Sequence, residues 1–246
     1  MITFSYGGGK QSVAIITMIL DGTLPRPDLI VIANTSREVS STWEYMNEIV
    51  QPALKNIGMD VAVACHDLAT VDLYASNGDI LIPAFTNGGK GKLPTHCSNE
   101  WKQRVIKRWL KRIGIEETDV WLGISLDEAE RMKPSGANWY RHVYPLIEIA
   151  PTSRSGCIER IKAFGWPEPN KSRCWMCPNQ SPWEWRNMKR ELPRDFAKAV
   201  ELEERMRQSD SDLYLHKLGI PLPDAISKSE EQTDMFDGCD SGYCFV

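Results

Sequence analysis

The most constraining feature of the sequence is a glycine-rich turn between a predicted strand and a predicted helix. Residues 2–5 form a short apolar run, residues 7–9 are three consecutive glycines, and an apolar helical pattern extends over 13–20. Glycines let the backbone approach a ligand with no Cβ in the way, so successive N–H groups can converge on an anion. The following helix adds its unpaired N–H groups and its dipole. The feature predicts a phosphate-binding loop rather than a flexible linker.

Two common phosphate loops are excluded by spacing. A Walker A loop needs a glycine where Phe4 stands and a serine or threonine where Gln11 follows Lys10. The dinucleotide-binding fingerprint needs a glycine or alanine where Ser12 stands. The loop therefore belongs to another class.

The remaining pattern predicts an α/β fold with a Rossmann-like parallel sheet, because predicted strands alternate with predicted helices. The expected strands are 2–5, 28–33, 60–64, 80–85 and 119–124, and the expected helices include 41–56, 98–113 and 194–207. Prolines make 145–183 irregular. We expect one domain over 1–190, with a nucleotide-binding core to about 150 and a cluster-binding segment at 151–190. A helical extension with an acidic, cysteine-bearing tail then covers 191–246.

In open α/β sheets, ligands bind beyond the carboxyl ends of the strands. Three such ends are expected to line one crevice: Ser5 with the glycine loop, residues 34–38, and residues 124–131. Arg37 could bind a phosphate or sulfate through two hydrogen bonds. Asp127 or Glu128 could hold the Mg²⁺ that an amide at position 11 cannot. The alternative for the hydroxyl residues in these segments is helix capping, and it stays open for Thr35, Ser36 and Ser125.

Composition places the chain among globular proteins, with 246 residues, 42% hydrophobic and 25% charged. The net charge of −4 equals that of residues 227–240, which hold five acids and one base, so the rest of the chain sums to zero and is not repelled from nucleic acid. No apolar run of membrane-spanning length occurs, and the predicted first strand leaves no room for a leader. We expect a cytoplasmic protein without a membrane partner.

Seven cysteines in a reducing compartment indicate metal binding or thiol chemistry rather than disulfides. Cys174 and Cys177, spaced C-x-x-C, could ligate one metal centre. Cys97 and Cys157 each precede a helical segment, where the thiol pKa is lowered, and are candidates for the other ligands. Zinc and an iron–sulfur cluster are both open, and a buried structural role is the alternative for Cys157. Cys65 follows a strand and is expected in the core.

Two further cysteines, Cys239 and Cys244, lie close to the end of the sequence near Gly238 and Gly242. Thiols on a glycine-bearing segment suit redox or persulfide chemistry. Cluster ligation, or no role at all, is the alternative for both.

A basic helix face is predicted over 102–112, where Arg104, Lys107, Arg108 and Lys111 recur at i, i+3, i+4 and i+7. Like charges at this spacing cost about 0.2–0.5 kcal/mol per pair, which an anionic partner would offset. A nucleic-acid backbone or a nucleotide phosphosulfate fits that role, and a solvated face is the alternative. Aromatic and basic residues farther along could extend the surface: Trp183, Trp185, Arg186, Lys189 and Arg190.

Several ordered segments together resemble the PP-loop adenine nucleotide α-hydrolase superfamily, and within it the phosphoadenylyl-sulfate (PAPS) reductase family. Residues 7–12 fill the six places of the Ser-Gly-Gly-x-Asp-Ser loop, with glycine for the first serine and Gln11 for the aspartate. Residues 34–38 followed by Thr42, residues 123–131 and residues 144–148 are similar to later motifs of the family. The similarity spans roughly residues 2–185.

The resemblance implies a site that binds ATP or a sulfonucleotide (PAPS or APS), with Mg²⁺. The cofactor-binding residues it indicates are Ser5, Gly7, Gly8, Gly9, Lys10, Gln11, Ser12, Asn34, Thr35, Arg37, Glu38 and Arg131. The catalytic candidates are Lys10, Asp127 and Cys244. It also favours a [4Fe-4S] cluster on Cys97, Cys157, Cys174 and Cys177, with zinc as the alternative.

Three functions fit these expectations. The first is an ATP-dependent enzyme that adenylylates an acceptor for sulfur transfer. The second is a sulfonucleotide reductase that releases sulfite, although the family's C-terminal Glu-Cys-Gly-Leu-His-type motif is absent. The third is a non-catalytic iron–sulfur protein that binds nucleotide or nucleic acid. The first two would require a sulfur-donor or electron-donor protein.

Overall fold

The structure, a computed structural model, describes residues 1–65, 73–75, 77–87 and 91–231. It divides into two compact units, here called unit 1 (residues 1–70 and 99–172) and unit 2 (residues 71–98 and 173–246). The chain thus leaves unit 1 after its first three strands and returns at residue 99. This division differs from the expected single domain over 1–190 with an extension after it.

Unit 1 contains a five-stranded parallel sheet in the order β3-β2-β1-β5-β6. Its strands are β1 (Ile2–Ser5), β2 (Leu29–Asn34), β3 (Val61–Cys65), β5 (Thr118–Leu122) and β6 (Tyr140–Val143). The predicted α/β class and the parallel sheet are confirmed, and the strand order is consistent with a Rossmann-like fold.

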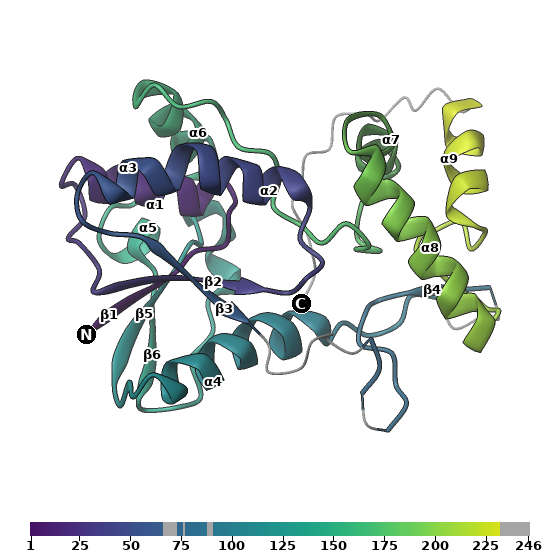
Figure 1. The fold of residues 1–246 in the computed structure, drawn as a ribbon, viewed down its shortest axis with the longest axis horizontal. Coiled ribbons are helices and arrows are strands. Elements are labelled where there is room, and N and C mark those ends of the chain that lie inside the picture. The colour runs from purple at the N-terminus through teal and green to yellow at the C-terminus, as the bar shows by residue number, and fades with distance from the viewer. Residues whose placement is uncertain (66–72, 76, 88–90, 232–246) are drawn as a thin grey trace. The chain divides into compact units, whose positions relative to one another are not determined.

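Helices cover both faces of this sheet (Figure 1). Ile30 and Ile32 of β2 face α1 (Lys10–Leu20) and α6 (Arg154–Ala163), whereas Val31 and Ala33 face α4 (Arg104–Arg112). A strand buried on both sides reads as an uninterrupted apolar run, which is how β2 appears in the sequence.

Shorter helical elements complete unit 1. The predicted helix over 41–56 is α2 (Ser40–Tyr45), the π-helical η1 (Met46–Val50) and α3 (Gln51–Lys55) in succession. The predicted helix over 98–113 is the π-helical η2 (Asn99–Gln103) followed by α4. The 3₁₀ helix η3 (Leu126–Arg131) and α5 (Pro145–Glu148) lie between β5 and α6. Both long predictions are therefore confirmed to within two residues.

Unit 2 is mainly helical. Its elements are α7 (Pro182–Glu191), α8 (Pro193–Ser209), α9 (Leu222–Glu231) and a two-stranded antiparallel sheet of β4 (Phe85–Thr86) and β7 (Leu213–Tyr214). The helix predicted at 194–207 is confirmed as α8.

Two sequence expectations fail in physically clear ways. The predicted strand at 80–85 is wrong, because only Phe85 belongs to a strand and Ile80 makes an isolated bridge. Pro83 lacks the N–H that a ladder needs, which interrupts the apolar run. Strand β6 was not expected, because Tyr-Arg-His-Val is short and half polar, as suits an edge strand.

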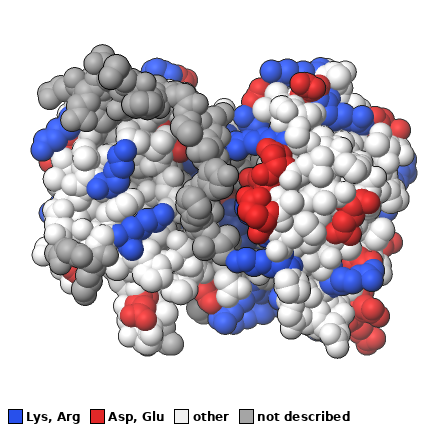
Figure 2. Space-filling view, turned by 180° about the vertical axis from the view of Figure 1, so that it is seen from behind, with Lys and Arg blue, Asp and Glu red and all other residues white. Residues whose placement is uncertain are grey.

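Charge and apolarity are distributed as in an ordinary globular surface. The face drawn in Figure 2 carries Lys and Arg as well as Asp and Glu side chains. Across the described ranges, no helix combines the length and apolarity needed to cross a bilayer.

A buried carboxylate organises the C-terminal half of unit 2. Glu203 of α8 is 2% exposed and accepts hydrogen bonds from the backbone N–H groups of Leu215 (2.8 Å) and Leu222 (2.6 Å). It therefore ties α8 to the segment after β7 and to the start of α9. Burial raises the pKa of this carboxyl above its usual range.

We expect Glu203→Ala to lower the free energy of unfolding by about 2–4 kcal/mol, because two buried N–H groups lose their acceptor. Chemical denaturation measures the loss. The neighbouring Glu204→Ala is the matched control, since that side chain is exposed, and it should change stability by less than about 0.5 kcal/mol. Equal effects of the two substitutions would contradict the anchoring role of Glu203.

Candidate functional site

The glycine loop after β1 is built as a tight backbone turn. Gly8 has φ of +71°, and Gly9 precedes α1 without a side-chain cap on the helix. The Gly7 N–H donates to Ser12 Oγ (3.0 Å), and Ser172 Oγ donates to the Gly7 carbonyl (2.5 Å). The loop is therefore fixed on both sides, while the N-terminus of α1 carries neither a side-chain cap nor an acidic residue in its first turn.

Gly8 is required by sterics as well as by its φ. A Cβ at this position would overlap Cγ2 of Thr42, a residue of α2 that is 3% exposed. Gly9 differs, because a Cβ there would meet Ser172 Cβ at an ordinary 3.8 Å. The first helix after β2 thus packs directly onto the loop.

The sheet order places this loop at the point where the winding of the sheet reverses. From β1 the chain adds β2 and β3 on one side, and β5 with β6 lies on the other. The segment after β5 packs onto the start of α1, since a Cβ on Gly123 would lie 3.2 Å from Ser12 Oγ and 3.3 Å from its backbone nitrogen. In open α/β sheets the ligand crevice lies at such a reversal.

Lys10, predicted to bind phosphate, is held by a carboxylate that the sequence did not reveal. Its Nζ lies 2.6 Å from Glu168 Oε1, and Lys162 lies 3.3 Å from the other oxygen of the same carboxylate. Hydrogen bonding to Lys10 lowers the pKa of Glu168, against a smaller opposing effect of burial. The Lys10 ammonium is therefore already paired with the Glu168 carboxylate.

The two acidic candidates after β5 have different partners. Glu128 accepts from Gln11 Nε2 (2.8 Å) and pairs with Arg131 (2.8 Å). Asp127 instead accepts from the backbone N–H of Arg154 at the start of α6 (2.8 Å). Glu128 is thus the carboxylate beside the loop, and it meets the residue that replaces the aspartate of the PP-loop pattern.

The end of β2 forms a tight polar turn. Asn34 Oδ1 accepts from the Ser36 N–H (2.8 Å), and Thr35 Oγ1 accepts from the Arg37 N–H (3.2 Å). Ser36 has a positive φ of +56°, and within the described ranges no other non-glycine residue has a positive φ. Thr35 therefore stabilises the turn locally and does not cap α2, whose N-cap is Val39.

Arg37 and Glu38 are oriented by the helix that precedes α4. The Arg37 guanidinium lies 4.6 Å from the centre of the Trp101 ring, and Glu38 Oε2 lies 3.2 Å from Lys102 Nζ. The other Glu38 oxygen and Thr42 Oγ1 are buried polar atoms with no hydrogen-bond partner in the part of the chain that the structure describes. Such atoms cost about 1–3 kcal/mol each, so they mark a place where a ligand or water is expected.

The cysteines divide between the units. Cys157 lies in α6, fully buried in the core of unit 1, and burial raises the pKa of its thiol to about 12. These surroundings support the structural alternative for Cys157. Cys65 is exposed at the end of β3, so its expected place in the core is wrong.

Cys97, Cys174 and Cys177 belong to unit 2 and are partly exposed. Cys174 and Cys177 form a turn in which the Cys177 N–H donates to the Cys174 carbonyl (3.1 Å). Within the described ranges, no three His, Cys, Asp or Glu side chains form a group that could hold a metal ion. Cys239 and Cys244 lie outside the described residues.

The basic face of α4 is largely satisfied within unit 1. Lys107 lies 4.8 Å from the centre of the Tyr140 ring and Lys111 lies 4.0 Å from that of Trp139, while Arg104 pairs with Glu100 (2.7 Å). Three of the four cations thus have partners in their own unit, a role in folding that differs from the expected alternative of a solvated face.

Comparison with protein-family models gives no match for this chain, and comparison with curated proteins gives none either.

The sequence pointed to the loop and to the ends of β2 and β5, but it did not point to three residues that contact them. Ser172 and Glu168 come from the irregular segment after α6, and Gly123 acts through backbone proximity. Of these three residues, only Glu168 could have been noticed in the sequence, because it is a carboxylate between two prolines shortly after the basic end of a predicted helical segment.

We expect Gly8→Ala to lower the free energy of unfolding by about 2–4 kcal/mol, from the strain of positive φ and the overlap with Thr42. Gly9→Ala is the matched control and should cost less than about 1 kcal/mol. Thr42→Ser removes the overlapping methyl group, so the double variant Gly8→Ala/Thr42→Ser should regain the steric part. Additivity in this cycle, measured by chemical denaturation, would contradict the proposed packing.

Proposed function

We propose that unit 1 binds the phosphate groups of an adenine nucleotide at the carboxyl ends of β1 and β5, and that the protein is a PP-loop-type enzyme of sulfur metabolism. The observation that carries this proposal is the position of the glycine loop. A glycine turn without a side-chain cap leads into α1 at the reversal point of the sheet, with the ends of β2 and β5 beside it. Those features together are what a nucleotide phosphate requires.

Each part of the site has a role in this proposal. The N–H groups at the start of α1 donate to phosphate oxygens, and Lys10 neutralises their charge. Because Glu168 already pairs with Lys10, nucleotide binding exchanges one anion for another. Arg37, held above Trp101, is the second cation for a phosphate or sulfate.

Glu128 is the proposed carboxylate for Mg²⁺. It lies beside Gln11, so a carboxylate reaches the loop from η3 although position 11 carries an amide. Asp127 accepts a hydrogen bond from the backbone of α6, so of the two carboxylates that the sequence offered for Mg²⁺ the proposal chooses Glu128.

The proposed reaction is adenylylation. An acceptor oxygen attacks the α-phosphorus of ATP, the bond between the α-phosphorus and the bridging oxygen breaks, and pyrophosphate leaves with that oxygen. A sulfur nucleophile then attacks the activated carbon of the acceptor, and AMP departs with the former acceptor oxygen. In this scheme a donor supplies the sulfur, and unit 1 positions ATP.

The cysteine centre stays a separate proposal. Cys174 and Cys177 have the spacing for two thiolate ligands, and Cys97 in the same unit is the third candidate. The described donor groups alone do not assemble a site for an iron–sulfur cluster or zinc. No step of the proposed reaction runs through that centre.

We expect Lys10→Ala to weaken ATP binding about tenfold or more, because a charge-assisted hydrogen bond to phosphate is lost. Glu168→Gln should strengthen it about twofold to fivefold, because a partly exposed competing ion pair is removed. Isothermal titration with ATP measures both effects. Glu159→Gln, the same charge change on an exposed side chain of α6, is the control and should leave affinity unchanged. Unaltered affinity in Lys10→Ala would refute the loop assignment.

The identity of the nucleotide is tested by products. We expect anaerobically purified protein to bind ATP and, with its acceptor present, to form pyrophosphate, because the proposed reaction breaks the bond between the α-phosphorus and the bridging oxygen. Phosphoadenylyl sulfate with reduced thioredoxin is the parallel assay. Sulfite release there, lost in Cys244→Ser, would favour the sulfonucleotide reductase instead.

A further inference from the structure

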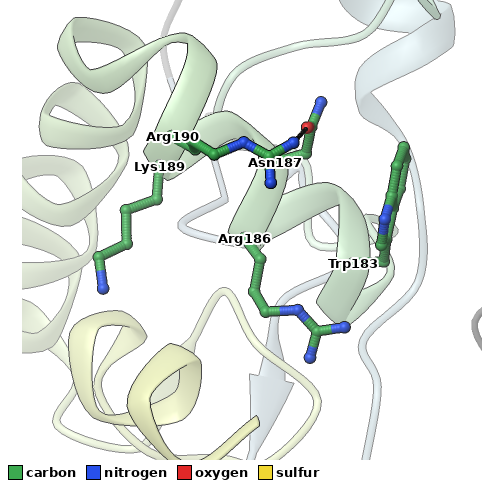
Figure 3. Close-up of a pocket in the computed structure, with 5 residues that line it drawn as sticks. All are labelled: Trp183, Arg186, Asn187, Lys189 and Arg190. Atoms are coloured by element: carbon green, nitrogen blue, oxygen red, sulfur yellow. Dashed lines mark hydrogen bonds between the residues drawn. The ribbon is translucent and has the colours of Figure 1, made fainter. Parts of the chain in front are cut away.

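One helix of unit 2 presents an exposed tryptophan and several cations around a single hollow. The hollow, of about 410 Å³, is lined in the described part of the chain by Trp183, Arg186, Asn187, Lys189 and Arg190 of α7 (Figure 3). No carboxylate is among these residues. All five belong to unit 2, whereas the glycine loop belongs to unit 1.

The helix separates its buried and exposed faces cleanly. Trp185 and Met188 are fully buried, and Ser181 with Glu184 forms a capping box in which each side chain accepts from the other's backbone. Trp183, Arg186, Asn187 and Arg190 recur at i, i+3, i+4 and i+7, which is one side of a helix. The buried face anchors α7, and Trp183 lies on the other face.

Trp183 is the informative residue on this face. All nine tryptophans lie in the described ranges, and Trp183, at 49% exposure, is the one classed with the exposed large hydrophobic residues. Its neighbour Trp185 fills the core, so the helix does not need a second buried indole. Exposed indoles beside cations serve for stacking on flat ligands that carry negative charge.

The cations are arranged along the helix rather than at a point. From Trp183 to Arg190 the helix rises about 10 Å, so Arg186, Lys189 and Arg190 can meet successive phosphates of a strand better than one phosphate group. Arg190 is oriented by Asn187 Oδ1 (2.8 Å) and by Glu191 Oε1 (2.7 Å), as the dashed bond in Figure 3 shows for Asn187. Its guanidinium is therefore held in place.

We infer that this face of α7 binds single-stranded nucleic acid, with a base stacked on Trp183 and backbone phosphates at Arg186, Lys189 and Arg190. A duplex fits less well, because its bases are already stacked and offer no free face to the indole. The sequence placed this contact on the basic face of α4, whereas the exposed indole and the hollow favour α7.

The test is fluorescence anisotropy with a fluorescein-labelled oligonucleotide of about 12 nucleotides, a length within single-strand site sizes. The full chain should bind it, and Trp183→Ala should weaken binding about fivefold to thirtyfold. Trp183→Phe keeps a stacking ring and should weaken it less. Arg186→Gln with Lys189→Gln should lower the salt slope by about 0.7 for each phosphate that is no longer neutralised.

The control is Arg205→Gln, an exposed arginine of α8 that does not line the hollow. It should leave affinity unchanged, as should Lys10→Ala, so that failure here is distinguished from failure of the nucleotide site. Three results would overturn the inference. Arg205→Gln could weaken binding as much as Trp183→Ala, a duplex of the same length could bind as tightly as the single strand, or ATP could displace the oligonucleotide at the concentration at which ATP binds unit 1. Unchanged thermal unfolding of Trp183→Ala verifies that folding is preserved.

Discussion

The parallel pairing of β1 between β2 and β5 is the constraint on which the candidate site depends. Ile2–Ser5 pairs with residues 119–122 on one side, and Thr3–Ser5 with residues 29–31 on the other, so the strand is fixed in register twice. A buried hydrogen bond between the hydroxyls of Thr3 and Thr118 (2.8 Å) adds to that pairing. Since β1 and β5 are paired in parallel, the loops that follow them start side by side. The segment at Gly123 therefore packs against the residues that follow the glycine turn.

Around that turn, the helix start contributes positive electrostatic potential, and a nearby ion pair reduces it. Thr42 and Ser172 hold Gly8 and Gly7 in a shape suited to an anion, and the uncapped start of α1 adds positive potential. The pair formed by Lys10 and Glu168 partly cancels this potential when no ligand is bound. Under the proposed function, an incoming phosphate would compete with Glu168 for Lys10.

Much of unit 1 could be predicted from sequence because its signals are local: apolar runs for the strands, periodicity for the helices and glycines for the turn. Pro83 was a local signal against a strand at 80–85, but the apolar residues around it favoured the strand prediction. The partners of Lys10 and Gly7 could not be foreseen, because Glu168 and Ser172 reach the loop through tertiary packing of an irregular segment. Burial could not be predicted either, since Cys65 ends β3 and Cys157 lies within α6, yet of these two cysteines only Cys157 is buried.

The helices α4 and α7 show why a basic spacing pattern alone does not identify a binding surface. The i, i+3, i+4 and i+7 positions hold four cations on α4, whereas on α7 they hold a tryptophan, two arginines and an asparagine. Lys107 and Lys111 of α4 lie against Tyr140 and Trp139 of the same unit. A cation seated on an internal ring has exchanged part of its hydration for that contact, so a polyanion must compete with the fold. On α7 the aromatic residue of the pattern faces solvent beside a hollow. Aromatic exposure, rather than charge, is therefore the property that separates a folding contact from a surface available to a partner.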